Sequence, residues 1–60
     1  MLKLTIETGN AAFDDGAAPY ECARILRLVA DALERGTRGA PLHDSNGNRV
    51  GRFDLTRGAE

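Results

Sequence analysis

Residues 40–55 have the sequence APLHDSNGNRVGRFDL, and this stretch predicts a β-hairpin. At its centre stands the dipeptide Asn46-Gly47, which favours a two-residue type I′ turn because both residues tolerate the positive φ that such a turn needs. Pro41 lacks a backbone N–H, so we expect its strand at the edge of a sheet or at the start of a strand. The stretch therefore supplies two antiparallel strands of the fold.

The returning strand of this hairpin has an irregular pattern of apolar residues. Val50 is out of step with Phe53 and Leu55, which share the other parity. Gly51 lies between them and is the expected β-bulge, because one extra residue would return Val50 to the buried side.

The amino-terminal residues 2–8 alternate apolar and polar side chains, a pattern typical of a strand with one buried face. The two faces are Leu2, Leu4 and Ile6 against Lys3, Thr5 and Glu7. A connector of small residues follows, in which Phe13 is expected to fold back over the core and Asp14-Asp15-Gly16 has the composition of a turn.

Residues 19–35 predict a helix. Pro19 suits a first helical turn, where its missing N–H would have no partner within the helix. Gly36 supplies a left-handed stop at the other end. The buried stripe recurs at helical spacing and consists of Cys22, Ile25, Leu26, Val29 and Leu33.

The order of these elements is β-α-β-β, with a strand at 2–8, a helix at 19–35 and a hairpin at 40–55. We predict a single α+β domain over residues 1–60, with a three-stranded antiparallel sheet in the order 1-3-2 and the helix packed on one face. The other face of the sheet is then left open. A chain of this length buries only about 60% of its unfolded surface, so its core is small. The sequence leaves open whether the chain forms a homodimer through a strand edge or a helix flank.

Composition excludes several classes of protein. Eight Lys and Arg stand against nine Asp and Glu, a net charge of −1, which lacks the basic excess usual in nucleic-acid binders. Direct nucleic-acid binding is therefore not expected. A single Cys cannot form an internal disulfide, and no apolar run approaches the length that crosses a bilayer. We expect no membrane partner and no small-molecule substrate.

The residues that usually carry chemistry do not form a catalytic or metal-binding pattern. His43 lies beside Asp44 and Ser45, but three neighbours in a tight hairpin cannot converge on one substrate. Cys22 falls on the buried helix stripe and is interpreted as core filler. Residues 44–48 imitate the start of a calcium loop, but the later positions lack its Gly and its Glu. One Cys and one His are too few for zinc. We expect no catalytic residue, no metal and no cofactor.

Charge is unevenly distributed along the chain, and this points to a candidate interface. Residues 1–23 carry four acids against one Lys, a net of −3, whereas residues 24–60 have a net of +2. The four acids lie at the end of the first strand, in the connector and at the start of the helix, which meet near one end of a β-α unit. Together they would form a negative field directed outward. The expected partner-binding residues are Glu7, Asp14, Asp15 and Glu21.

Four stretches carry a resemblance to a known group of proteins: LTIE (4–7), NAAF (10–13), ARILR with VAD (23–27 and 29–31) and DSNGNRVG (44–51). Together they resemble a family of very small phage and prophage proteins, some of which are similar to anti-CRISPR inhibitors, including those of type I-C systems. The resemblance implies a stoichiometric, non-catalytic inhibitor in the cytoplasm of the bacterial host. It would bind a subunit of a CRISPR surveillance complex and block capture of target DNA.

The way in which such an inhibitor would act is left open by the sequence. Carboxylates could imitate the phosphates of duplex DNA, but the net charge near zero departs from strongly acidic DNA mimics and also permits a mixed-charge interface. The alternative function is a small phage regulatory or DNA-associated module that uses the Arg-bearing hairpin. In that case Arg49, Arg52 and Arg57 would contact phosphates.

Overall fold

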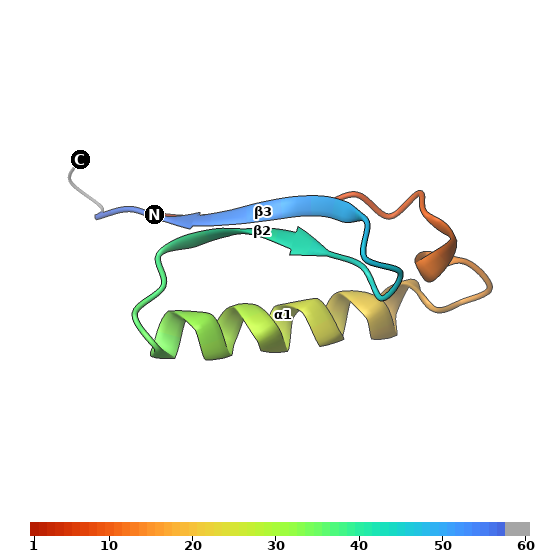
Figure 1. Cartoon of the computed structure of the whole chain (residues 1–60), viewed down its shortest axis with the longest axis horizontal. Coiled ribbons are helices and arrows are strands. Elements are labelled where there is room, and N and C mark those ends of the chain that lie inside the picture. Colours follow the sequence, from red (N-terminus) through yellow and green to blue (C-terminus); the bar gives the residue numbers. More distant parts are fainter. Residues whose placement is uncertain (58–60) are drawn as a thin grey trace.

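A computed structural model describes residues 1–57, so the last three residues of the predicted domain lie outside the described part. The predicted α+β fold is confirmed: one helix lies across one face of a three-stranded antiparallel sheet in the order β1-β3-β2 (Figure 1). The molecule is elongated, 40 × 19 × 17 Å. Its elements are β1 (Leu2–Ile6), the 3-10 helix η1 (Ala11–Phe13), α1 (Ala18–Glu34), β2 (Gly39–His43) and β3 (Arg49–Leu55).

The core lies between α1 and the sheet, and η1 closes one end of it. Ile25 and Val29 of α1 pack against Phe53 of β3, while Phe13 covers the end as the connector folds back. Ile25 and Phe53 are each only 1% exposed. The full set of buried apolar residues is Phe13, Ile25, Val29, Leu42, Val50 and Phe53.

The predicted bulge is present in β3. Leu42 pairs with Gly51 but its neighbour His43 pairs with Arg49, so Val50 is the extra residue and is buried. Glycine is required at the next position because a Cβ on Gly51 would collide with the backbone carbonyl oxygen of Thr5 in β1. The bulge thus keeps Val50 in the core and lets the two strands approach closely.

The hairpin turn differs from the prediction of a two-residue type I′ turn. Within residues 1–57 Gly47 has a positive φ of 84°, whereas Asn46 does not. The Gly47 N–H donates to the carbonyl of Asp44, and the Asp44 N–H donates to that of Asn48. This pattern fits a three-residue loop, a type I turn followed by a left-handed glycine. The longer loop forms because the Asp44 side chain accepts hydrogen bonds from the backbone that follows it.

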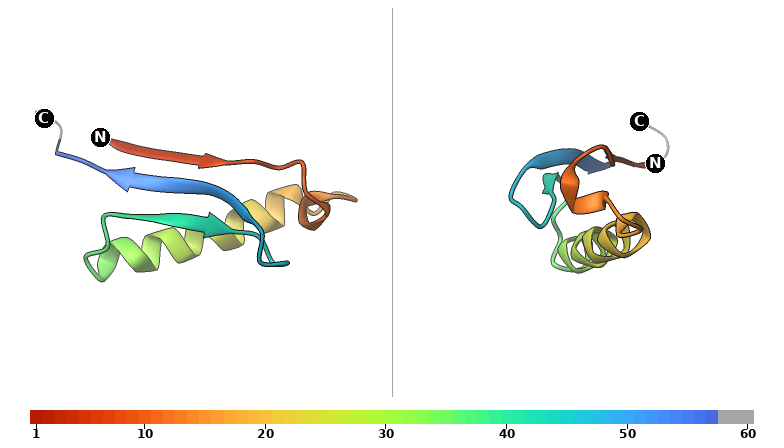
Figure 2. Two further views of the ribbon diagram at one scale, coloured as in Figure 1. Left: turned by 45° about the horizontal axis from the view of Figure 1, so that its top comes forward. Right: turned by 90° about the vertical axis from the view of Figure 1, so that its right-hand side faces the viewer.

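One face of the sheet is not covered by the helix, as the views in Figure 2 show. The register pairs Thr5 with Arg52, and Arg52 with Pro41, so these residues share the uncovered face. β2 forms one edge of the sheet, which is where Pro41 was predicted to lie. The fold therefore positions two surfaces for contact with other molecules: the open sheet face and the end that carries η1.

Candidate functional site

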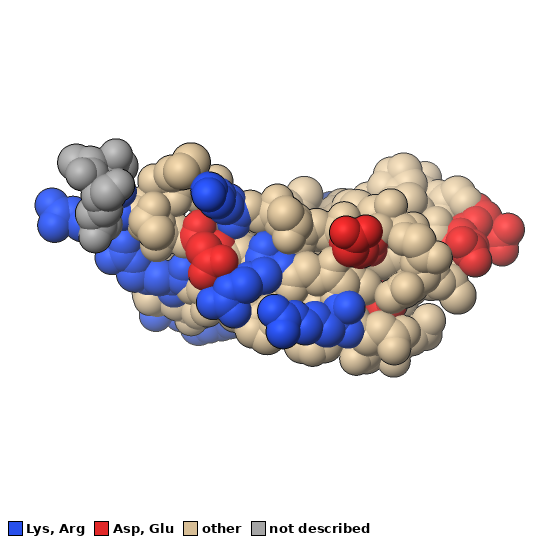
Figure 3. Space-filling model, turned by 90° about the horizontal axis from the view of Figure 1, so that it is seen from above, with Lys and Arg blue, Asp and Glu red and all other residues tan. Residues whose placement is uncertain are grey.

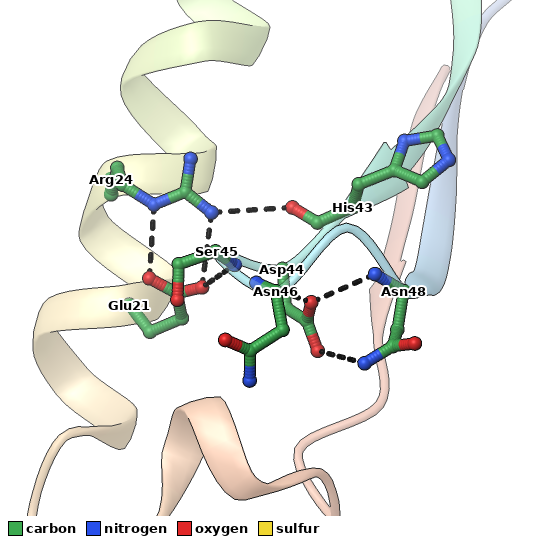
Figure 4. Close-up of polar contacts among 7 residues, drawn as sticks. All are labelled: Glu21, Arg24, His43, Asp44, Ser45, Asn46 and Asn48. Carbon is green, nitrogen blue, oxygen red and sulfur yellow. Dashed lines mark hydrogen bonds and ion pairs between the residues drawn. The ribbon is translucent and has the colours of Figure 1, made fainter.

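Asp44 organises the junction between the hairpin turn and the loop before η1. Its side chain is only 5% exposed. Oδ1 accepts hydrogen bonds from the backbone N–H groups of Asn46 and Asn48, each at 2.9 Å. Oδ2 accepts one from the side-chain amide of Asn10 at 3.1 Å and one from that of Asn48 at 3.4 Å. Through Asn10 the carboxylate therefore joins two loops that are far apart in the sequence. Figure 4 shows its hydrogen bonds to Asn48 within the hairpin turn.

Glu21 joins the first turn of α1 to the same hairpin (Figure 4). Its side chain is 8% exposed and is held by Arg24, whose Nε lies 2.9 Å from Oε1 and whose Nη2 lies 3.0 Å from Oε2. The Ser45 N–H donates to Oε2 at 2.6 Å. Arg24 Nη2 also donates to the carbonyl oxygen of His43 at 3.2 Å. We call Asn10, Glu21, Arg24, Asp44, Ser45 and Asn48 the junction network.

The electrostatics of the junction network favour two ionised carboxylates. The hydrogen bond from Arg24 lowers the pKa of Glu21 against the opposing effect of burial. Burial alone would raise the pKa of Asp44, but the hydrogen bonds from Asn48, Asn10 and Asn46 outweigh it and lower the pKa. Within residues 1–57 every buried side-chain nitrogen and oxygen has a hydrogen-bond partner. This arrangement fastens the turn to the helix and suits a structural role.

The four predicted partner-binding residues divide into two groups. Glu7, Asp14 and Asp15 are exposed. Asp14 and Asp15 follow η1 at one end of the molecule, whereas Glu7 follows β1 and its N–H donates to the carbonyl of Val50 in β3, so Glu7 lies beside the sheet. Figure 3 shows acidic groups at that end, away from most Lys and Arg of the same face. Glu21 does not face outward as expected: it is buried in the junction network, because Arg24 and Ser45 hold its carboxylate inward. We call Asp14 and Asp15 the acidic tip.

The carboxylates of the acidic tip have no hydrogen bond or ion pair with any other of residues 1–57. Asp15 has a positive φ of 57°, followed by Gly16 at 81°, so the connector turns sharply where the two adjacent acids stand. Their charges are neutralised by nothing within the described part of the chain. These side chains can therefore contact cations of another molecule without first breaking an internal contact.

The remaining candidates for chemistry stay separate in the structure. His43 is exposed at the end of β2, and the free thiol of Cys22 is half-buried on α1. No group of three or more His, Cys, Asp or Glu side chains that could hold a metal ion occurs among residues 1–57. A groove of about 280 Å³ lies between α1 and β2, with a mainly apolar lining that includes Leu28, Val29 and Pro41. In the same part of the chain no helix is long and apolar enough to cross a membrane.

Comparison of the chain with protein-family models, with curated proteins and with solved structures gave no match.

The hydrogen-bond donors to the two buried carboxylates were not predicted from the sequence. Arg24 follows Glu21 by three positions, which is a spacing at which helical side chains meet and is therefore a local signal for this ion pair. An Asp two residues before Asn46 is also a known signal for a side chain that bonds to the following backbone. The link from Asn10 to Asp44 spans 34 residues and has no local signal.

Proposed function

We propose that this protein is a stoichiometric, non-catalytic inhibitor that binds a subunit of a CRISPR surveillance complex and blocks its binding to target DNA. The acidic tip is the proposed contact. Its carboxylates would occupy positions that DNA phosphates otherwise take beside Lys and Arg of the subunit. The host cytoplasm is the compartment that this proposal implies.

The single observation that carries the proposal is the difference in how the chain uses its carboxylates. The carboxylates of Asp44 and Glu21 accept hydrogen bonds from other parts of the chain. The two carboxylates of the acidic tip are exposed and have no internal partner among residues 1–57. Unpaired charge directed at solvent favours fast association with an oppositely charged surface. The resemblance to small phage proteins supplies the class of partner.

The test measures target-DNA binding by purified surveillance complexes, with a type I-C complex first, while the protein is titrated in. The wild type is expected to abolish DNA binding at about one protein per binding site. Asp14→Lys with Asp15→Lys should lose this inhibition, because repulsion replaces attraction at the contact. Circular dichroism on the same samples confirms that the variant is folded.

The matched control is Asp31→Lys with Glu34→Lys, which changes the charge by the same amount on exposed positions of α1. It should inhibit as well as the wild type. Equal inhibition by the tip variant would overturn the acidic tip as the contact. A wild type that inhibits no surveillance complex would overturn the inhibitor function itself.

A further inference from the structure

The open face of the sheet gathers cationic side chains that are distant in the sequence. Thr5 pairs with Arg52, and the next outward-facing residue of β1 is Lys3, which lies directly opposite Asp54. His43 and Arg49 face each other across β2 and β3. The bulge at Val50 lets Arg49 and Arg52 share one face although they are three residues apart. Lys3, Arg49 and Arg52 thus lie on the side of the sheet away from α1.

These cations differ in how far they are engaged. Arg52 is ion-paired with Asp54 at 2.9 Å on the same face. Lys3 and Arg49 are exposed, and neither has an ion pair or a side-chain hydrogen bond within residues 1–57. Figure 3 looks down on this face: Lys and Arg dominate one half of its length, and most acidic groups lie toward the other end. The net charge of −1 therefore conceals a local cationic surface.

The spacing of these cations suits a regular polyanion. Alternate residues of one strand stand about 6.8 Å apart, and diagonal neighbours such as Lys3 and Arg52 about 7–8 Å, so Lys3 and Arg49 lie about two such steps apart, on either side of Arg52. Successive phosphates along a nucleic-acid strand have a comparable separation, and the hydroxyl of Thr5 adds a hydrogen-bond donor between the cations. We propose that the open sheet face binds the phosphodiester backbone of a nucleic acid, through Lys3 and Arg49.

This surface is separate from the acidic tip, and the proposal does not depend on the inhibitor function. The acidic tip lies at the far end, and Glu21 and Asp44 lie inside the junction network, whereas Asp54 stays on the open face and is ion-paired with Arg52. Two unpaired cations support weak binding that depends strongly on salt and is not sequence-specific.

The test is fluorescence anisotropy of labelled single-stranded and duplex oligonucleotides at low salt, repeated at rising salt. The plot of log binding constant against log salt should have a steeper slope for the wild type than for Lys3→Glu with Arg49→Glu. The expected difference is about 1.8 for duplex and about 1.4 for single strands, from two phosphate contacts. The double variant should bind at least about tenfold more weakly, as loss of two charge contacts implies. The oligonucleotide form that the wild type binds with the higher affinity at the same salt concentration is the preferred form.

The matched control is Arg27→Glu with Arg35→Glu, which makes the same change of charge on the helix side. It should retain the wild-type slope. Equal weakening by both double variants would show attraction to overall charge and overturn the proposal. Lack of binding by the wild type at low salt would also overturn it, as would equal affinity for polyglutamate, which represents an acidic protein surface. None of these outcomes involves a surveillance complex, so they leave the inhibitor test independent.

Discussion

The junction network and the acidic tip use the same residue type in opposite ways. Asp44 accepts four hydrogen bonds and is 5% exposed, whereas Asp14 and Asp15 are exposed and accept none from other side chains of residues 1–57. Both groups lie toward the same end of the molecule, where the hairpin turn, η1 and the start of α1 meet (Figure 1). Local composition alone does not separate them.

The difference teaches that the number of nearby donors decides the role of a carboxylate in a chain this small. A buried carboxylate is tolerated only where donors replace its lost water. Asp44 finds them in the turn that it starts, and Glu21 finds them in Arg24 and Ser45. The carboxylates of the acidic tip have no such donors and stay hydrated, so their charge is available to a partner.

The largest expected effect comes from removing the carboxylate with the most partners. Asp44→Ala removes the charged acceptor of the partly buried hydrogen bonds from the N–H groups of Asn46 and Asn48 and from the amide of Asn10, and hydrogen bonds to an ionised acceptor are the strong ones. We expect a fall in Tm of many degrees, or loss of the cooperative transition, by circular dichroism. Asp14→Ala, the matched control, should unfold like the wild type. Similar Tm values for the two variants would contradict the difference in role between Asp44 and Asp14.

Lowering the pH should weaken the junction network and so destabilise the fold, with a smaller effect than Asp44→Ala. The folded-state pKa of Glu21 lies below its ordinary value of 4.5, and that of Asp44 below 3.8. Each group therefore adds stability that is fully present above its ordinary pKa and is lost as the pH falls toward the folded value. Urea unfolding midpoints should be flat near neutrality and fall below about pH 4.5.

Glu21→Gln provides the control for this acid effect. It keeps the shape of the side chain and an acceptor for the Ser45 N–H, but it removes the group that titrates. Its midpoint should be lower than that of the wild type at neutral pH, and the two curves should converge as the pH falls. Parallel curves would show that Glu21 does not contribute to the acid sensitivity.

The sequence was sufficient for the fold because local patterns and global topology agree. Alternation predicted the first strand, helical spacing predicted α1, and the parity break at Gly51 predicted the bulge that places Val50 in the core. The type I′ turn was wrong because the Asp44 carboxylate competes for the backbone of the turn. Glu21 was misplaced because it is held from two sides: Arg24 stands three residues away on the helix, and the Ser45 N–H comes from a segment 24 residues away. Such non-local donors leave no periodic signal.

The smallest expected effect on stability is at the acidic tip. Asp14→Asn with Asp15→Asn removes both charges and keeps the left-handed backbone at position 15, because Asn tolerates that conformation as Asp does. Thermal unfolding should match the wild type, and the acid profile should be unchanged, since neither carboxylate has an internal partner among residues 1–57. Inhibition of DNA binding should nevertheless weaken, although less than for the Lys variant, because attraction is lost without added repulsion. A clear fall in Tm would show that these acids belong to the folded network, and the separation of structural from partner-binding carboxylates would then fail.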